Sequence, residues 1–210
     1  CSLPTYFCTN KVMRFCVLCN DDSWKDLFPE LPVILLDSGA PIHADKDDVL
    51  FDLRDEAWEL DRYSHYHQPV FMAGVIGTLK NYQAPEHLVR INNWPGMFSH
   101  PSIEAVGAVS VQGEATAILQ LLGKQVEWVA DVAGMVSPRV IAMIINEACF
   151  AWEEGVSDQE SIDIAMKLGT NYPHGPFEWA SQIGWDRIKS LQKALAKESN
   201  IYIPAKTLES

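Results

Sequence analysis

The spacing of hydrophobic residues changes about two thirds of the way along this 210-residue chain. In the first part, short apolar runs alternate with polar and turn residues, which is typical of buried strands. A strand, a short helix and a second strand begin a right-handed parallel unit. Six or seven strands with few, short helices therefore predict an α/β fold with a reduced, doubly wound, Rossmann-like parallel sheet. We predict strands over residues 12–20, 32–37, 49–53, 69–74, 87–92, 104–111 and 125–131, and helices over 24–28 and 113–124.

Beyond residue 131 the apolar positions recur every three or four residues, as they do in helices. The first of these helices should begin at Ser137, which can cap the exposed amides, with Pro138 at the first helical position. A stripe as wide as the one on this helix predicts burial in a bundle or against a partner chain. The stripe comprises Val136, Val140, Ile141, Ile144, Ile145, Ala148, Cys149 and Trp152.

Three further helices are predicted in the remaining residues. Ser157 and Glu160 have the spacing of a capping box, and the helix that they begin should end at Gly169. A short helix should begin near Phe177, and an amphipathic helix near Asp186. We therefore predict two domains, a Rossmann-like sheet domain over residues 1–131 and an all-α helical domain over residues 132–210.

The charge of the chain narrows the range of partners. A net charge of -12 argues against nucleic acid and against anionic membrane surfaces, and mildly against a broad phosphate-binding face. No apolar run approaches the roughly 20 residues that span a bilayer. The first residues, CSLPTYFCTN, lack a basic segment followed by an apolar core, so we expect no signal peptide.

Cysteines and histidines could in principle form redox or metal sites. Cys16 and Cys19 form a CxxC, but thiols three apart on a strand point to opposite faces, so we expect them in the core. His65 and His67 have HxH spacing, but the sequence places no third ligand beside them, and we expect no metal. An odd count of five cysteines, with Cys149 inside an apolar helix, favours reduced thiols in the cytoplasm.

The second half of the chain carries several motifs in a fixed order. The stretch GMVSPRVIAMIINEACFAWEEGVSDQESIDIAMKLGTNYPHGPFEWASQIGWD resembles the C-terminal domain of the L-3-hydroxyacyl-CoA dehydrogenases over about fifty residues. That family has a turn reading G-F-[IV]-x-N-R, an apolar helix with N-E-A, and a later P-x-G-P-F-E. The resemblance implies a nucleotide-binding domain followed by a helical dimerisation domain, hence a homodimer. It also implies NAD as cofactor and an acyl-CoA as substrate.

The turn that resembles the family most closely runs from Tyr172 to Glu178. The resemblance implies that His174, Gly175, Pro176 and Phe177 lie on the substrate side of the site. The alternative is that this turn only packs the helical domain and its dimer.

The catalytic positions of the family are kept only in part. Aligning the family's H-F-F-N-P on Pro95 puts Ile91 at the place of the catalytic histidine, which is the general base. Glu104 falls near the partner glutamate, and Thr78 could supply the family's serine hydroxyl. Pro138 replaces the asparagine. His100, between Ile91 and Glu104, is the candidate for a displaced base.

The cofactor motif is also altered. A dinucleotide site needs a glycine-rich turn after the first strand, yet no glycine occurs from Cys1 to Ser38. Asp21 and Asp22 place negative charge where the two phosphates would lie, a repulsion of about 1 kcal/mol per pair even in water. Asp37, at the end of the second strand, is the candidate for contact with the ribose hydroxyls. We expect that NAD is not bound tightly.

Three hypotheses follow. The first is a diverged member of the 3-hydroxyacyl-CoA dehydrogenase family with weak or no hydride transfer, which binds an acyl-CoA or serves dimeric assembly. The second is an active NAD-dependent oxidoreductase whose site uses His100, Glu104 and Thr78. The third is a purely structural dimer.

Overall fold

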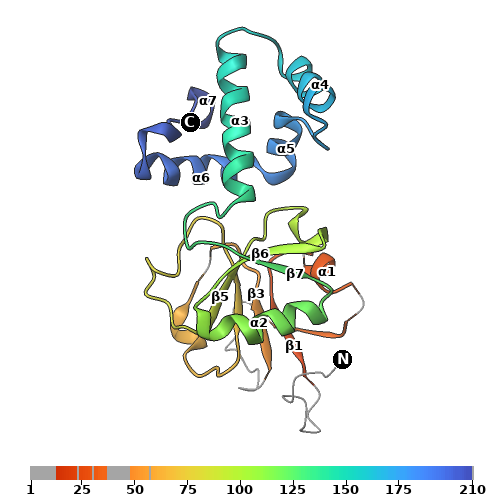
Figure 1. Ribbon diagram of the computed structural model, residues 1–210, viewed down its shortest axis with the longest axis vertical. Coiled ribbons are helices and arrows are strands. Elements are labelled where there is room, and N and C mark those ends of the chain that lie inside the picture. The colour runs from red at the N-terminus through yellow and green to blue at the C-terminus, as the bar shows by residue number, and fades with distance from the viewer. Residues whose placement is uncertain (1–12, 23, 30, 37–47, 57, 210) are drawn as a thin grey trace.

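The chain folds into a sheet with a helical layer stacked above it (Figure 1). The computed structural model describes residues 13–22, 24–29, 31–36, 48–56 and 58–209. Among these residues, no helix is long and apolar enough to cross a bilayer.

Seven strands form the sheet in the order β2-β1-β3-β4-β5-β6-β7. All neighbouring strands are parallel except β5 and β6, which are antiparallel. The predicted α/β class with a Rossmann-like sheet is confirmed, with one reversed pairing that the apolar pattern did not indicate. The strands are β1 (Phe15–Leu18), β2 (Val33–Leu36), β3 (Val49–Asp52), β4 (Val70–Ala73), β5 (Leu88–Ile91), β6 (Ser102–Val106) and β7 (Gln125–Trp128).

Alternating side chains of the strands fill the two faces of the sheet. Phe51 and Phe71 stack on one face with ring centroids 4.4 Å apart, and Leu50 and Met72 lie on the other. Cys16 belongs to the second face, whereas Cys19 packs against the first, as expected for thiols three apart on a strand.

The predicted strand over 104–111 is wrong at its end. β6 stops at Val106, and helix α2 (Val109–Leu121) begins four residues before the predicted Gly113. The reason is that the side chains that α2 buries are spaced as on a helix and pack against β5 and β7. These side chains are Val111, Ala115, Ile118 and Leu119.

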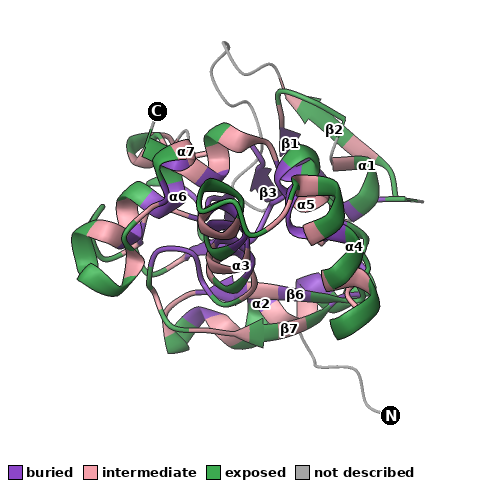
Figure 2. Ribbon diagram, turned by 90° about the horizontal axis from the view of Figure 1, so that it is seen from above, coloured by how far each residue is buried: buried purple, intermediate pink, exposed green. Residues whose placement is uncertain are grey.

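All four helices predicted after residue 131 are present. They are α3 (Ser137–Glu153), α4 (Gln159–Thr170), α5 (Pro176–Ile183) and α6 (Trp185–Glu198), and a short α7 (Lys206–Glu209) follows that was not predicted. α3 packs against α4, α5, α6 and α7. α4 buries one residue, Asp163, and is otherwise half-buried or exposed (Figure 2).

The caps of α4 differ from the prediction. Asp158, rather than a Ser157–Glu160 box, caps its first turn by accepting a hydrogen bond from the Ser161 amide at 2.8 Å. The helix continues past Gly169 and ends at Asn171, which adopts the left-handed conformation at φ 56°. Asn is one of the few residues that takes this conformation at low cost, so it replaces glycine as the stop.

Candidate functional site

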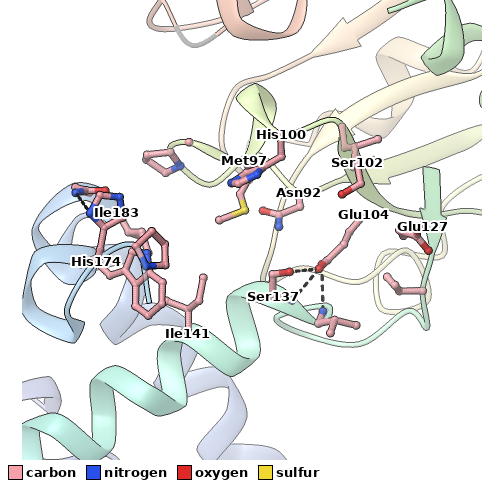
Figure 3. Close-up of a pocket in the computed structure, with 18 residues that line it drawn as sticks. Asn92, Met97, His100, Ser102, Glu104, Glu127, Ser137, Ile141, His174 and Ile183 are labelled. Carbon is pink, nitrogen blue, oxygen red and sulfur yellow. Dashed lines mark hydrogen bonds between the residues drawn. The ribbon is translucent and has the colours of Figure 1, made fainter. Parts of the chain in front are cut away.

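A pocket of about 640 Å³ lies between the sheet and the helical layer (Figure 3). Its sheet side is formed by β6, β7 and the residues after β5, and its helical side by α3 and α5. The lining mixes apolar side chains with polar ones. The polar side chains are Asn92, His100, Ser102, Glu104, Glu127, Ser137, His174 and Gln182, and the larger apolar ones include Met97, Ile141, Trp179 and Ile183.

Glu104 reaches from β6 to the start of α3. Its Oε1 accepts a hydrogen bond from the Ser137 amide at 2.8 Å and its Oε2 one from the Val136 amide at 3.2 Å. The Ser137 hydroxyl also donates to Oε1 (Figure 3). A carboxylate at a helix N-terminus binds unpaired amides and is favoured by the helix dipole. The prediction that Ser137 caps α3 is wrong, because its first amides bind the carboxylate of Glu104, from the sheet.

His100 is exposed and lines the sheet side of the pocket. It follows the short 3-10 helix η3 (Met97–Ser99). The buried Lys124 holds this segment because its Nζ donates to the carbonyl oxygens of Phe98 and, at 2.8 Å, of His100. Burial lowers the pKa of Lys124, and the negative charge of Asp26 partly opposes that shift. The backbone of His100 is thus fixed, while its imidazole stays open to solvent.

His174 lines the helical side of the same pocket. Its Nδ1 lies 3.1 Å from Nε2 of Gln182 and 3.9 Å from Oε2 of Glu178. Glu178 in turn pairs with Lys167 and accepts a hydrogen bond from the Gly175 amide at 3.0 Å. The bond from Lys167 is the largest cause of the lowered pKa of Glu178.

The other three predicted substrate-side residues, Gly175, Pro176 and Phe177, are buried and do not line the pocket. The buried Asp163 of α4 caps α5, accepting from the amides of Phe177 at 2.8 Å and Glu178 at 3.0 Å. A Cβ on Gly175 would come within 2.3 Å of the Asp163 carboxyl carbon, so only glycine fits here. These contacts favour the alternative that the turn packs the helical layer.

Three further positions of the family's site, Thr78, Ile91 and Pro138, do not line the pocket. Thr78 is buried, and its hydroxyl accepts a hydrogen bond from the Asn81 amide at 3.1 Å. Ile91, at the place of the family's histidine, is fully buried in the sheet core. Pro138 is buried in the first turn of α3. Asp37 lies outside the described residues.

The carboxyl end of the sheet at β1 and β3 is where open α/β sheets bind ligands. Here helix α1 (Trp24–Leu27) after β1 has only four residues. Burial is the largest cause of the raised pKa of the Cys19 thiol, and the charges of Asp21, Asp22 and Asp52 add to it. Asp21 and Asp22 place two carboxylates at this edge, where they oppose a pyrophosphate. Lys25 partly offsets this charge, because its Nζ lies 2.7 Å from Oδ2 of Asp22.

The space beside β1 at this edge is filled by the chain itself. Asp52, at the end of β3, binds the guanidinium of the buried Arg54, with Oδ2 2.6 Å from Nη2, and accepts a hydrogen bond from the Tyr63 hydroxyl. Arg54 also pairs with Glu59 at 3.0 Å. The residues at this edge therefore do not form the bare amide-lined turn that a dinucleotide needs.

Several polar residues that hold this architecture were not predicted from the sequence. Asp163 and Arg90 are buried charges, and Glu56 accepts hydrogen bonds from a loop that follows β4. Asp163 lies within the stretch that resembles the family, but the sequence did not indicate that it caps α5. The described residues contain no cluster of His, Cys, Asp or Glu that could hold a metal ion.

A mostly parallel sheet followed by a helical layer is also the fold of solved structures. The structure of Mycobacterium tuberculosis FadB2 covers 94% of this chain and 92% of its own, with a TM-score of 0.73 and 15% identity, which shows the fold alone. An Escherichia coli K12 3-hydroxybutyryl-CoA dehydrogenase structure is 33% identical, with a TM-score of 0.57, over 68% of this chain and 31% of that chain.

Sequence comparison defines the family. The profile for "3-hydroxyacyl-CoA dehydrogenase, C-terminal domain" matches residues 134–209. The E. coli K12 3-hydroxyadipyl-CoA dehydrogenase is 43% identical over 108 residues, which are 51% of this chain and 23% of that protein. Residues 134–209, the helical domain, therefore belong to the family of 3-hydroxyacyl-CoA dehydrogenase C-terminal domains. The matched part spans less than a third of the first curated relatives.

Proposed function

We propose that this chain is a diverged 3-hydroxyacyl-CoA dehydrogenase relative that binds the acyl end of an acyl-CoA in the pocket and transfers hydride weakly or not at all. The observation that carries the proposal is the state of Glu104, whose carboxylate faces the pocket but is engaged by two amides and a hydroxyl at the start of α3. A general base needs a free carboxylate partner that orients its ring. The Glu104 carboxylate instead accepts hydrogen bonds from the N-terminus of α3.

The pocket itself supports the acyl-CoA part of the proposal. Its volume falls within the usual range for small-molecule sites, about 300–1,000 Å³. Met97, Ile141, Trp179 and Ile183 provide apolar surface for an acyl chain. Glu104 and Glu127 would disfavour a phosphate at the same place. We therefore assign the pocket to the uncharged acyl and thioester end of the ligand.

Weak cofactor binding is the second part of the proposal. It is supported by the acidic residues after β1 and by the side chains that fill the edge of the sheet beside β3. The relatives are dehydrogenases, so NAD is the cofactor to test. Calorimetric titration with NAD and NADH should give no saturable heat in the micromolar range. Micromolar binding of either nucleotide would refute this part.

The acyl-CoA site can be tested separately. Gln182→Trp should fill the pocket from α5 and abolish the heat of binding of acetoacetyl-CoA. Gln120→Trp is the matched control, because Gln120 is equally an exposed glutamine on a helix but lies on α2, outside the pocket lining. Equal binding of acetoacetyl-CoA by both variants would show that the ligand does not bind in this pocket.

A second function is favoured by one observation: His100, Glu104 and His174 all line the same pocket. An exposed imidazole there could act as a displaced base in an active oxidoreductase, the second hypothesis from the sequence. Reduction of acetoacetyl-CoA by NADH that is lost in His100→Ala, and kept in His65→Ala, would establish it. His65 is also an exposed histidine, away from the pocket.

Assembly is the remaining part of the proposal. Large apolar side chains are exposed on α3 and α4 and the loop between them, and we assign this surface to a homodimer interface; it comprises Val140, Trp152, Val156, Ile164 and Leu168. A chain that dimerises but binds neither NAD nor any CoA ester would fit the purely structural reading. We also propose a domain boundary at residues 131/132 and a cytoplasmic location.

A further inference from the structure

A loop that follows β4 presents consecutive backbone amides to a single carboxylate. Oε1 of Glu56 accepts hydrogen bonds from the amides of Val75 at 2.5 Å and Ile76 at 2.6 Å, and Oε2 accepts one from the Gly77 amide at 2.9 Å. Successive amides that converge on one point form a concave site for anions. We call the amides of Val75, Ile76 and Gly77 the amide cradle.

The opposite side of the cradle carries a buried positive charge. Nη1 of Arg90, which is fully buried, donates to the carbonyl oxygens of Val75 at 3.3 Å and Gly77 at 2.6 Å. The carbonyl of Val75 and the amide of Ile76 belong to one peptide unit, which therefore has the guanidinium on its carbonyl side and the carboxylate on its amide side. A cation that polarises this carbonyl makes the Ile76 amide a stronger donor. Burial lowers the pKa of Arg90, and the charges of Asp131, at 3.2 Å, and then of Glu56 oppose that shift.

The backbone around the cradle is shaped to admit these side chains. A Cβ on Gly77 would meet Oε2 of Glu56 at 2.9 Å and Tyr82 at 2.8 Å, and a Cβ on Gly74 would meet Trp58 at 2.5 Å. Glu56 itself has a φ of 54°, which costs a non-glycine residue about 1 kcal/mol or more. Gly77 thus leaves room for the Glu56 carboxylate, and Glu56 adopts a strained backbone conformation to reach the amides.

We infer that the amide cradle is an anion-binding site of the carboxylate class whose resident ligand is Glu56. The site lies just beyond the carboxyl end of β4, the edge at which open α/β sheets bind ligands. An external anion reaches these amides only when Glu56 leaves them. The inference rests on the contacts of the cradle alone and stands whether or not the pocket binds an acyl-CoA.

The test is rescue by a free carboxylate. Glu56→Gly removes the ligand and also relieves the positive φ, so the loss of Tm reflects the missing carboxylate. Formate, added at constant ionic strength against chloride, should raise the Tm of this variant saturably, by about 3–6 °C at tenfold over its dissociation constant. Wild type should show no such rise.

Glu153→Ala is the matched control. Glu153 also accepts amide hydrogen bonds, from Lys206 at 3.2 Å and Thr207 at 2.7 Å, but it is exposed, so water replaces it when it is removed. A formate response equal in the two variants, or none in Glu56→Gly, overturns the inference. A response to phosphate without one to formate overturns the assignment to carboxylates.

A second measurement covers the case in which Glu56→Gly does not fold. In Glu56→Gln the side chain keeps its shape but loses its charge, so the amide proton resonances of Val75, Ile76 and Gly77 should move upfield together, because hydrogen bonds to an ionised acceptor are the stronger ones. Unchanged resonances at all three positions overturn the inference.

Discussion

Replacing Glu104 by Gln should destabilise the fold although the shape of the side chain is kept. Glu104 carries a negative charge at the N-terminus of the 17-residue helix α3 and accepts from two amides and one hydroxyl. Loss of the charge removes about 0.5–1 kcal/mol of interaction with the helix dipole. The amide group of Gln has one acceptor oxygen, so at least one charge-assisted hydrogen bond is lost, worth about 1–2 kcal/mol. The sum is about 2 kcal/mol.

Urea unfolding at neutral pH, followed by circular dichroism, measures this loss directly. A change of about 2 kcal/mol corresponds to a fall in Tm of about 4–8 °C for a chain of this size. Glu127→Gln is the control, because Glu127 lines the same pocket from β7 but is exposed, and its replacement should change stability by less than about 0.5 kcal/mol. If Glu104→Gln is no more destabilising than Glu127→Gln, the capping role of Glu104 is wrong.

Three further changes have defined outcomes. Gly175→Ala should lower the free energy of unfolding by about 3 kcal/mol or more, because the new methyl group would meet the Asp163 carboxyl carbon at 2.3 Å. Gly155→Ala, whose Cβ would lie in open space but whose φ is +74°, should cost about 1–2 kcal/mol in the same urea assay. Burial raises the pKa of the Cys149 thiol from 9.0 to about 11, so the neutral thiol contributes fully to the free energy of unfolding below about pH 9, and this contribution is lost as the pH rises toward 11. After treatment with iodoacetamide at pH 8, mass spectrometry should find Cys149 unmodified. Rapid modification in the native protein would contradict this. Leu168→Asp should yield a monomer by analytical ultracentrifugation if its 82% exposed side chain lies in a homodimer interface, and an unchanged dimer would exclude it from that interface.

Much of the fold could be predicted from the order of apolar residues. Each of the seven strands contains two β-branched or aromatic residues, and the helices after residue 131 follow the spacing of their buried side chains. The apolar pattern predicted the wrong element where it fits both a strand and a helix. The alternating residues before Val111 suit a strand, but packing of α2 on β5 and β7 made them the first turn of a helix.

The sequence alone identified the family of the helical domain. Its motifs consist of glycine, proline and acidic residues that form turns and caps through local chemistry, so they are recognisable without the fold. The sequence also determined that Ile91 and Pro138 carry no catalytic group, since chemistry absent from a side chain is absent in any fold. Only the tertiary structure decided what the carboxylates do. Glu104, Asp163 and Glu56 each bind amides that lie between 14 and 33 residues away along the chain. A carboxylate can cap a helix, fill a cradle or assist a base equally well, and the choice depends on which backbone the fold brings within 3 Å of it.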